Sequence, residues 1–139
     1  MTGPGRILVV DDNLTLRVLL TQALEAAGYV AIAAESAEAA LDVARFDPPD
    51  LWVVDHHMPG MDGAQLIRAL RRSPDERLRT APAIGLTGYE EAANDLVAAG
   101  AICALAKPCG ERVLLDRIAL ALAPPGAAHR PHLAPAAQA

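Results

Sequence analysis

Aromatic side chains make up only 3% of this 139-residue chain, so they contribute little to a hydrophobic core. The core must be built from Leu, Val, Ile and Ala, and a hydrophobic content of 53% supplies enough of them for one domain. Cysteine is also scarce, and Cys103 and Cys109 form neither a CxxC motif nor a metal-binding spacing. We therefore expect two reduced thiols and no disulfide framework.

Positive charge is in deficit as well. The chain has 12 Lys and Arg against 17 Asp and Glu, which gives a formal net charge of -5. Binding to a phosphate backbone requires a basic surface, so the composition argues against nucleic acid as the main ligand. No apolar run approaches the roughly 20 residues of a membrane span, and the first residues lack the apolar core of a signal peptide. We expect a cytoplasmic protein that does not bind membranes.

Apolar runs typical of buried strands alternate with amphipathic helical segments five times along the chain. Strands are predicted at 7–10, 29–34, 51–54, 83–86 and 102–106, and helices at about 14–27, 37–46, 64–72, 90–99 and 110–123. Ser36 is placed to cap the second helix. The polar segment 73–82 is expected to be a mobile connection. This alternation predicts an α/β fold with a doubly wound, mostly parallel, five-stranded sheet and helices on both faces.

The predicted domain covers residues 5–123. Residues 124–139 are rich in Pro and Ala and show no core-forming period, so a disordered tail is expected there.

Five polar residues follow the apolar runs directly. Asp11 and Asp12 follow the first strand, Asp55 the third, Thr87 the fourth and Lys107 the fifth. Ligands of doubly wound sheets bind at the carboxyl ends of strands, so these side chains are expected to converge. An aspartate can act as a covalent nucleophile towards phosphorus, and Asp55 stands alone on the most central predicted strand. The set therefore indicates a site that accepts a phosphoryl group.

The acids also suit a magnesium ion, which takes oxygen ligands and keeps several waters. Asp12, Asp55 and a backbone carbonyl near His57 would bind it, with Asp11 acting through a water. A simpler interpretation is that the acidic pair caps the first helix, but a third acid on a separate strand favours the metal. Lys107 would add positive charge beside the phosphoryl oxygens, although a solvated strand-end lysine is the simpler alternative.

Four motifs occur in order: ValValAspAsp at 9–12, ValValAspHisHisMetProGlyMetAspGly at 53–63, LeuThrGly at 86–88 and AlaLysPro at 106–108. Together they resemble the receiver domain of two-component response regulators over roughly residues 5–123. The resemblance implies a flavodoxin-like sheet with strand order 2-1-3-4-5. It also implies roles for the site residues: Asp55 as phosphoacceptor, Asp11 and Asp12 as the Mg²⁺ acidic pair, Thr87 as switch hydroxyl and Lys107 as phosphate-binding lysine.

The resemblance further implies partners and a mechanism. A sensor histidine kinase or a histidine phosphotransfer protein would donate the phosphoryl group, and the outer side of the first helix (Leu14, Arg17, Val18 and Thr21) would face the kinase. Phosphorylation would draw Thr87 inward and change the surface of the fourth helix, fifth strand and fifth helix, to which a downstream protein binds. Autophosphatase activity would be weak at most, so the chain would not be an enzyme in the usual sense.

Two features bear on that mechanism. The family usually has an aromatic residue shortly before the lysine whose rotamer follows the switch hydroxyl, and we assign its place to Leu105. Switching is then expected to be altered or weak. His57 and Tyr89 occupy positions that flank the path of the hydrolytic water in the family, so they would tune the lifetime of the phosphoryl group.

A single-domain receiver is expected, because the 16 residues after Ala123 leave no room for an output domain. A phosphorylation-independent binding module remains an alternative. A flavodoxin-like electron carrier would need a hydroxyl- and Gly-rich phosphate loop after the first strand, and an aspartate-based phosphatase would need a second acid two residues after its nucleophile. Neither is present. A homodimer through the Ala-rich fourth helix is left open.

Overall fold

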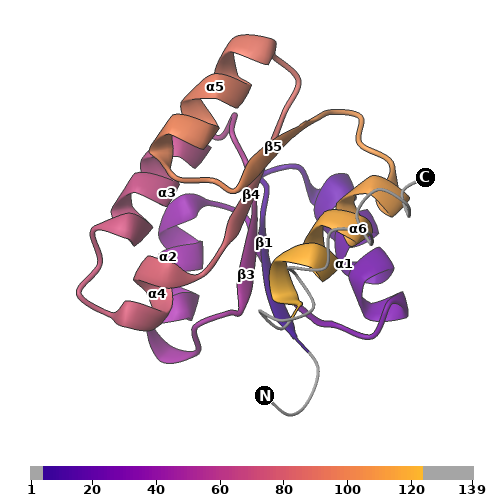
Figure 1. The fold of residues 1–139 in the computed structure, drawn as a ribbon, viewed down its shortest axis with the longest axis horizontal. Helices are drawn as coiled ribbons and strands as arrows, with labels where there is room; N and C mark the ends of the chain where they lie inside the picture. Colours follow the sequence, from indigo (N-terminus) through magenta and orange to yellow (C-terminus); the bar gives the residue numbers. More distant parts are fainter. Residues whose placement is uncertain (1–4, 124–139) are drawn as a thin grey trace.

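A five-stranded parallel sheet forms the centre of the molecule in the computed structural model, which describes residues 5–123 (Figure 1). The strands lie in the order β2-β1-β3-β4-β5, which confirms the predicted fold class and strand order. Their bounds are β1 Arg6–Val10, β2 Val30–Ala34, β3 Leu51–Asp55, β4 Ala83–Thr87 and β5 Cys103–Ala106. The predicted tail lies outside the described residues.

Six helices in the described part connect and follow the strands, one more than the sequence predicts. They are α1 Leu14–Ala26, α2 Ala37–Phe46, α3 Gly63–Arg71, α4 Glu76–Thr80, α5 Glu90–Ala99 and α6 Glu111–Leu122. Ser36 caps α2 as expected, because its hydroxyl accepts a hydrogen bond from the backbone of Ala39. Asp62 and Gln65 form a capping box at the start of α3. No helix within residues 5–123 is long and apolar enough to cross a bilayer.

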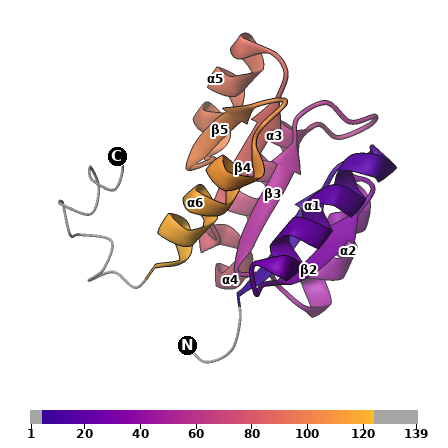
Figure 2. The same ribbon diagram turned by 90° about the vertical axis from the view of Figure 1, so that its right-hand side faces the viewer.

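The helices form a layer on each side of the sheet (Figures 1 and 2). Alternate residues of each strand point to opposite faces. Leu8, Trp52 and Val54 pack on one face beneath α2, α3, α4 and α5. Val9 and Val53 pack on the other face with residues of α1 and α6. Because both faces are covered, β3 and β4 are buried along their whole length, which explains why their sequences are continuous apolar runs.

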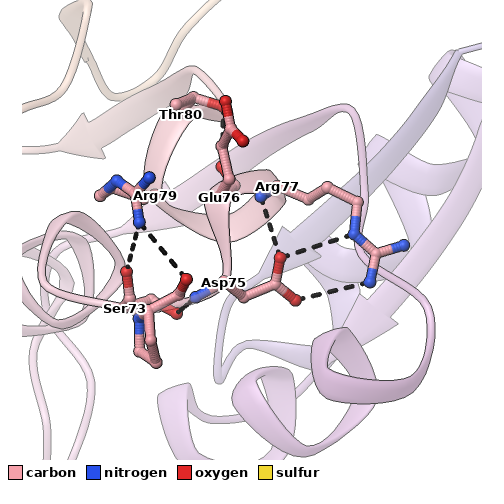
Figure 3. A network of polar contacts seen from close by, with 7 residues as sticks. Ser73, Asp75, Glu76, Arg77, Arg79 and Thr80 are labelled. Atoms are coloured by element: carbon pink, nitrogen blue, oxygen red, sulfur yellow. Dashed lines mark hydrogen bonds and ion pairs between the residues drawn. The ribbon is translucent and has the colours of Figure 1, made fainter.

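The expectation of a mobile connection over 73–82 is wrong, because this segment contains α4. Asp75 caps the helix by accepting a hydrogen bond from the Arg77 backbone, and the Arg79 guanidinium donates to the Ser73 carbonyl (Figure 3). Leu78 turns inward and is only 6% exposed. One buried apolar side chain in a polar sequence is too weak a period to predict a helix of this length.

Candidate functional site

The carboxyl edge of the sheet carries a cavity of about 610 Å³, and the predicted polar residues gather there. Its lining residues come from the ends of β1, β3, β4 and β5: Asp11, Asp12, Asn13, Asp55, His57, Gly88, Tyr89 and Lys107. The parallel register brings these strand ends level, with Val10 beside Val54, Asp55 beside Leu86 and Thr87 beside Ala106. Convergence of the site thus follows directly from the sheet topology.

Asp11 has the most constrained carboxylate in the cavity, with 1% of the residue exposed. Its Oδ1 accepts a hydrogen bond from the Asn13 backbone at 2.9 Å, while its buried Oδ2 has no hydrogen-bond partner among the described residues. Asp12, the next residue, is exposed. A buried carboxylate oxygen without a donor is costly, so the geometry fits a cation bound beside it.

Asp55 and Lys107 form an ion pair across the cavity. Lys107 Nζ lies 2.7 Å from Asp55 Oδ1 and 3.7 Å from Asp11 Oδ2. Burial raises the pKa of Asp55 above its ordinary value. The hydrogen bond and charge of Lys107 lower this pKa and the charges of Asp11 and Asp12 raise it, but burial is the largest effect and the net change is a rise. Burial alone would lower the pKa of Lys107, but Asp55 and Asp11 outweigh it, so this pKa is raised. One lysine brings a single positive charge to a cluster of three carboxylates, so it does not neutralise them.

Oxygen atoms of Asp11, Asp12 and Asp55 lie within 4.8 Å of one another. Three carboxylates at such distances repel unless positive charge intervenes. An all-oxygen donor set suits a hard divalent cation such as Mg²⁺ rather than zinc, which prefers nitrogen and sulfur ligands. The residues present therefore fit the metal that the sequence implies.

Thr87, at the end of β4, is 2% exposed and does not contact Asp55 through a hydrogen bond. Its hydroxyl accepts from the Tyr89 backbone N–H at 3.1 Å and lies 3.4 Å from the Tyr89 carbonyl. The exposed Tyr89 ring packs edge-on against His57, with ring centroids 4.8 Å apart. His57 and Tyr89 therefore flank the mouth of the cavity together, on the side of Thr87.

The assignment of the aromatic coupling position to Leu105 is wrong. Leu105 packs into the core on the α1 and α6 face of the sheet, whereas Gly85 and Thr87, two residues apart on β4, face the other side, where Gly85 meets Leu96 of α5. The β5 residues on that side are Ala104, which pairs with Gly85 and packs against the same core as α5, and Ala106, which pairs with Thr87. The place beside Thr87 therefore carries a small side chain.

Arg17 also differs from its expected position on the outer, kinase-facing side of α1. Its guanidinium turns back and donates to the Asp11 carbonyl at 2.8 Å. The sequence reasoning missed this contact, and it also missed Asn13 and Gly88 as lining residues. Arg17 follows the N-cap Asn13 by four residues, about one helical turn, and this spacing is the sequence signal that could have placed it near the loop that precedes the helix.

The start of α3 packs against the backbone of Asp55 and His56. Gly63 donates its backbone N–H to the His56 carbonyl at 3.0 Å. A methyl group on Gly63 would come within 2.7 Å of the Asp55 carbonyl oxygen and 2.8 Å of His56 Cα. Glycine at this position thus lets α3 pack directly against the backbone that carries Asp55.

Comparison with known proteins agrees with this geometry. The family model of the response regulator receiver domain matches residues 7–119. The chain belongs to this family. The sensory/regulatory protein RpfC of Xanthomonas campestris pv. campestris is 36% identical over 116 residues, which cover 82% of this chain and 16% of RpfC.

Solved structures of receiver domains share the fold. The chemotaxis protein CheY4 of Vibrio cholerae is 28% identical with a TM-score of 0.79, covering 86% of this chain and 100% of CheY4. The receiver domain of a signal transduction histidine kinase from Syntrophus aciditrophicus is 33% identical with a TM-score of 0.78, covering 91% of this chain and 93% of that domain. The chain spans 15–16% of the length of the sensory and sensor-kinase relatives it matches, so the likeness concerns the receiver domain alone.

Proposed function

We propose that residues 5–123 act as a receiver domain that accepts a phosphoryl group on Asp55 in a cytoplasmic two-component or phosphorelay pathway. The observation that carries the proposal is the cluster itself. Asp55 pairs with Lys107 at 2.7 Å and shares its cavity with two further carboxylates. The donor is a sensor histidine kinase or a histidine phosphotransfer protein, and relatives that include a sensor histidine kinase support this assignment.

Phosphoryl transfer places the reacting groups in line within this cavity. An oxygen of Asp55 forms a bond to phosphorus as the P–N bond to the donor histidine breaks, and the electron pair returns to the imidazole nitrogen. Asp11, Asp12, Asp55 and the backbone carbonyl of His57 would hold Mg²⁺. The ion, when bound, supplies positive charge that neutralises the phosphoryl oxygens.

Lys107 and Thr87 respond to the new charge. Lys107 exchanges its contact with the Asp55 carboxylate for a contact with a phosphoryl oxygen. Thr87 gives up its backbone contacts at Tyr89 and donates its hydroxyl to another phosphoryl oxygen. The loop between β4 and α5 then moves, and the face formed by α5, β5 and α6 changes its affinity for a downstream protein. With Ala104 on that side of β5, no aromatic ring takes part in this coupling.

The test is intact-protein mass after incubation with a small-molecule phosphodonor, with Mg²⁺ or with a chelator, for wild type and Asp55→Asn. We expect one added phosphoryl group on the wild type with Mg²⁺ only, and none on the variant. The control variant is Asp116→Asn, which changes an exposed carboxylate on α6. A phosphoryl group retained by Asp55→Asn would refute the assignment. No gain, together with no Mg²⁺-dependent binding of a fluoride analogue of the phosphoryl group, would favour a phosphorylation-independent binding module.

A further inference from the structure

Arg17 is the one residue of α1 that donates a side-chain hydrogen bond to the loop carrying the acidic pair, within the described residues. Its Nη1 lies 2.8 Å from the carbonyl oxygen of Asp11. The contact is partly buried and joins the second turn of the helix to the end of β1. A hydrogen bond from a charged guanidinium is stronger than one between neutral groups.

Further hydrogen bonds hold Asp11 and the cap residue Asn13 in the same loop. The Asp11 backbone N–H donates to the Ala34 carbonyl at 3.1 Å, and Asp11 Oδ1 accepts from the Asn13 backbone. Asn13 in turn caps α1 by accepting from the Leu16 backbone at 3.0 Å. With the Asp11 carbonyl held by Arg17, the remaining acceptor of this residue is the buried Oδ2, which accepts no hydrogen bond among the described residues and lies 3.7 Å from Lys107 Nζ.

We propose that Arg17 is a positioning residue for the metal site: by holding the Asp11 carbonyl, it keeps Asp11 Oδ2 and the Asp12 carboxylate aimed into the cavity. The inference rests on the proposed function, since it concerns Mg²⁺ held by these acids. Residues that orient metal ligands typically change metal affinity by about 10- to 100-fold when they are replaced.

Arg17 acts through geometry rather than through its charge. Lys107 is the cation that approaches the carboxylates, whereas Arg17 contacts the main chain behind them. A variant that keeps a positive charge but loses the planar fork of donors should therefore restore only part of the effect.

The experiment measures Mg²⁺ binding by isothermal titration calorimetry and the melting temperature without metal, for wild type, Arg17→Met and Arg17→Lys. Arg68→Met is the matched control, because Arg68 is exposed on α3 and its side chain makes no hydrogen bond or ion pair within residues 5–123. We expect Arg17→Met to bind Mg²⁺ about tenfold more weakly, with a metal-free melting temperature close to that of wild type. Arg17→Lys should fall between the two, and the control should match wild type.

Each other result has a distinct meaning. Unchanged Mg²⁺ affinity in Arg17→Met overturns the inference, whether or not the metal-free melting temperature falls. Full recovery by Arg17→Lys overturns the geometric explanation in favour of charge. A wild type that shows no saturable Mg²⁺ binding refutes the proposed function itself, and the inference with it.

Discussion

Lys107 is the only lysine among the 139 residues, and it lies in the candidate site. Its ammonium group pairs with Asp55 and lies near Asp11, while 27% of its side chain remains exposed. The carboxylates raise its pKa even though burial alone would lower it. Lys107 is therefore held in its charged form, which is the form needed to attract a phosphoryl group.

This arrangement predicts how Lys107 reacts with an amine-acylating reagent. Asp55→Asn removes the negative charge of Asp55, and with it the charge-assisted hydrogen bond that raises the Lys107 pKa, whereas the burial that lowers this pKa remains. Each unit by which the pKa falls multiplies the neutral, reactive fraction by about ten. We expect Lys107 to be acylated severalfold faster in Asp55→Asn at mildly alkaline pH, measured by peptide mass spectrometry. The N-terminal amine of the same molecule is the internal reference, and an unchanged ratio between the two sites would contradict the prediction.

One half-buried arginine connects the helices α3, α4 and α5. Arg71, the last residue of α3, donates to the carbonyls of Arg79 and Ala81 at 3.0 and 2.8 Å, and to the Gly100 carbonyl at 3.0 Å. Gly100 has φ of 120°, in the region that favours glycine, and a methyl group there would press against the Arg71 side chain. Together with the network around Asp75, this contact holds α4 in place (Figure 3).

Replacing this arginine tests that role. Arg71→Met keeps the apolar stem but removes all three hydrogen bonds and leaves carbonyl groups without a donor. Since a hydrogen bond to a charged group contributes about 1.5–3 kcal/mol, we expect the free energy of unfolding to fall by about 3 kcal/mol. Urea unfolding followed by the fluorescence of Trp52, the sole tryptophan, measures it. Arg68→Met, exposed on the same helix, should change the free energy of unfolding little. Equal losses in both variants would argue against a stabilising role of the Arg71 hydrogen bonds.

Regular elements were predictable where a strong period or a cap was present, and less so elsewhere. The apolar runs at 51–54 and 83–86 predicted β3 and β4 to within a residue, because a sheet covered on both faces requires such runs. The helix α4 was missed because Leu78 alone gives no helical period, and because Arg71, which donates to the carbonyls of Arg79 and Ala81, lies outside the segment. Leu105 was assigned to the wrong face, since a shift of one residue along a strand reverses the direction of its side chain.

At the scale of the whole molecule, the site forms where strands distant in sequence end side by side. This convergence was predictable, because parallel strands with short connections bring their carboxyl ends to one edge. The contact of Arg17 with Asp11 was not, because it depends on the rotamer of a long side chain. The fold brings three carboxylates and one lysine together at this edge. Because buried carboxylates that lie close together repel, we expect this cluster to lower the free energy of unfolding of the metal-free protein.

The variant Asp55→Asn tests whether the Asp55 carboxylate destabilises the metal-free fold. The folded pKa of Asp55 lies above its unfolded value, so its contribution to folding is most favourable in acid and is lost as the pH rises through the folded pKa. At neutral pH the ionised carboxylate therefore destabilises the metal-free fold, and the neutral Asn of similar shape should raise the melting temperature. The difference should shrink as the pH is lowered, because wild-type Asp55 then becomes protonated. Lys107 also contributes to folding stability through its raised pKa, but this contribution is lost only at alkaline pH. It therefore does not change the pH range over which Asp55 affects stability.

Magnesium should reverse the order of the melting temperatures of wild type and Asp55→Asn. Binding to the folded state stabilises wild type by about 2.7 kcal/mol at a hundred times the dissociation constant, whereas the variant, lacking one carboxylate of the cluster, should gain less. Thermal unfolding with and without Mg²⁺ over a range of pH measures both effects, and Asp116→Asn should follow wild type throughout. A variant that melts below wild type at neutral pH without metal would show that the Lys107 ion pair outweighs burial and repulsion at Asp55.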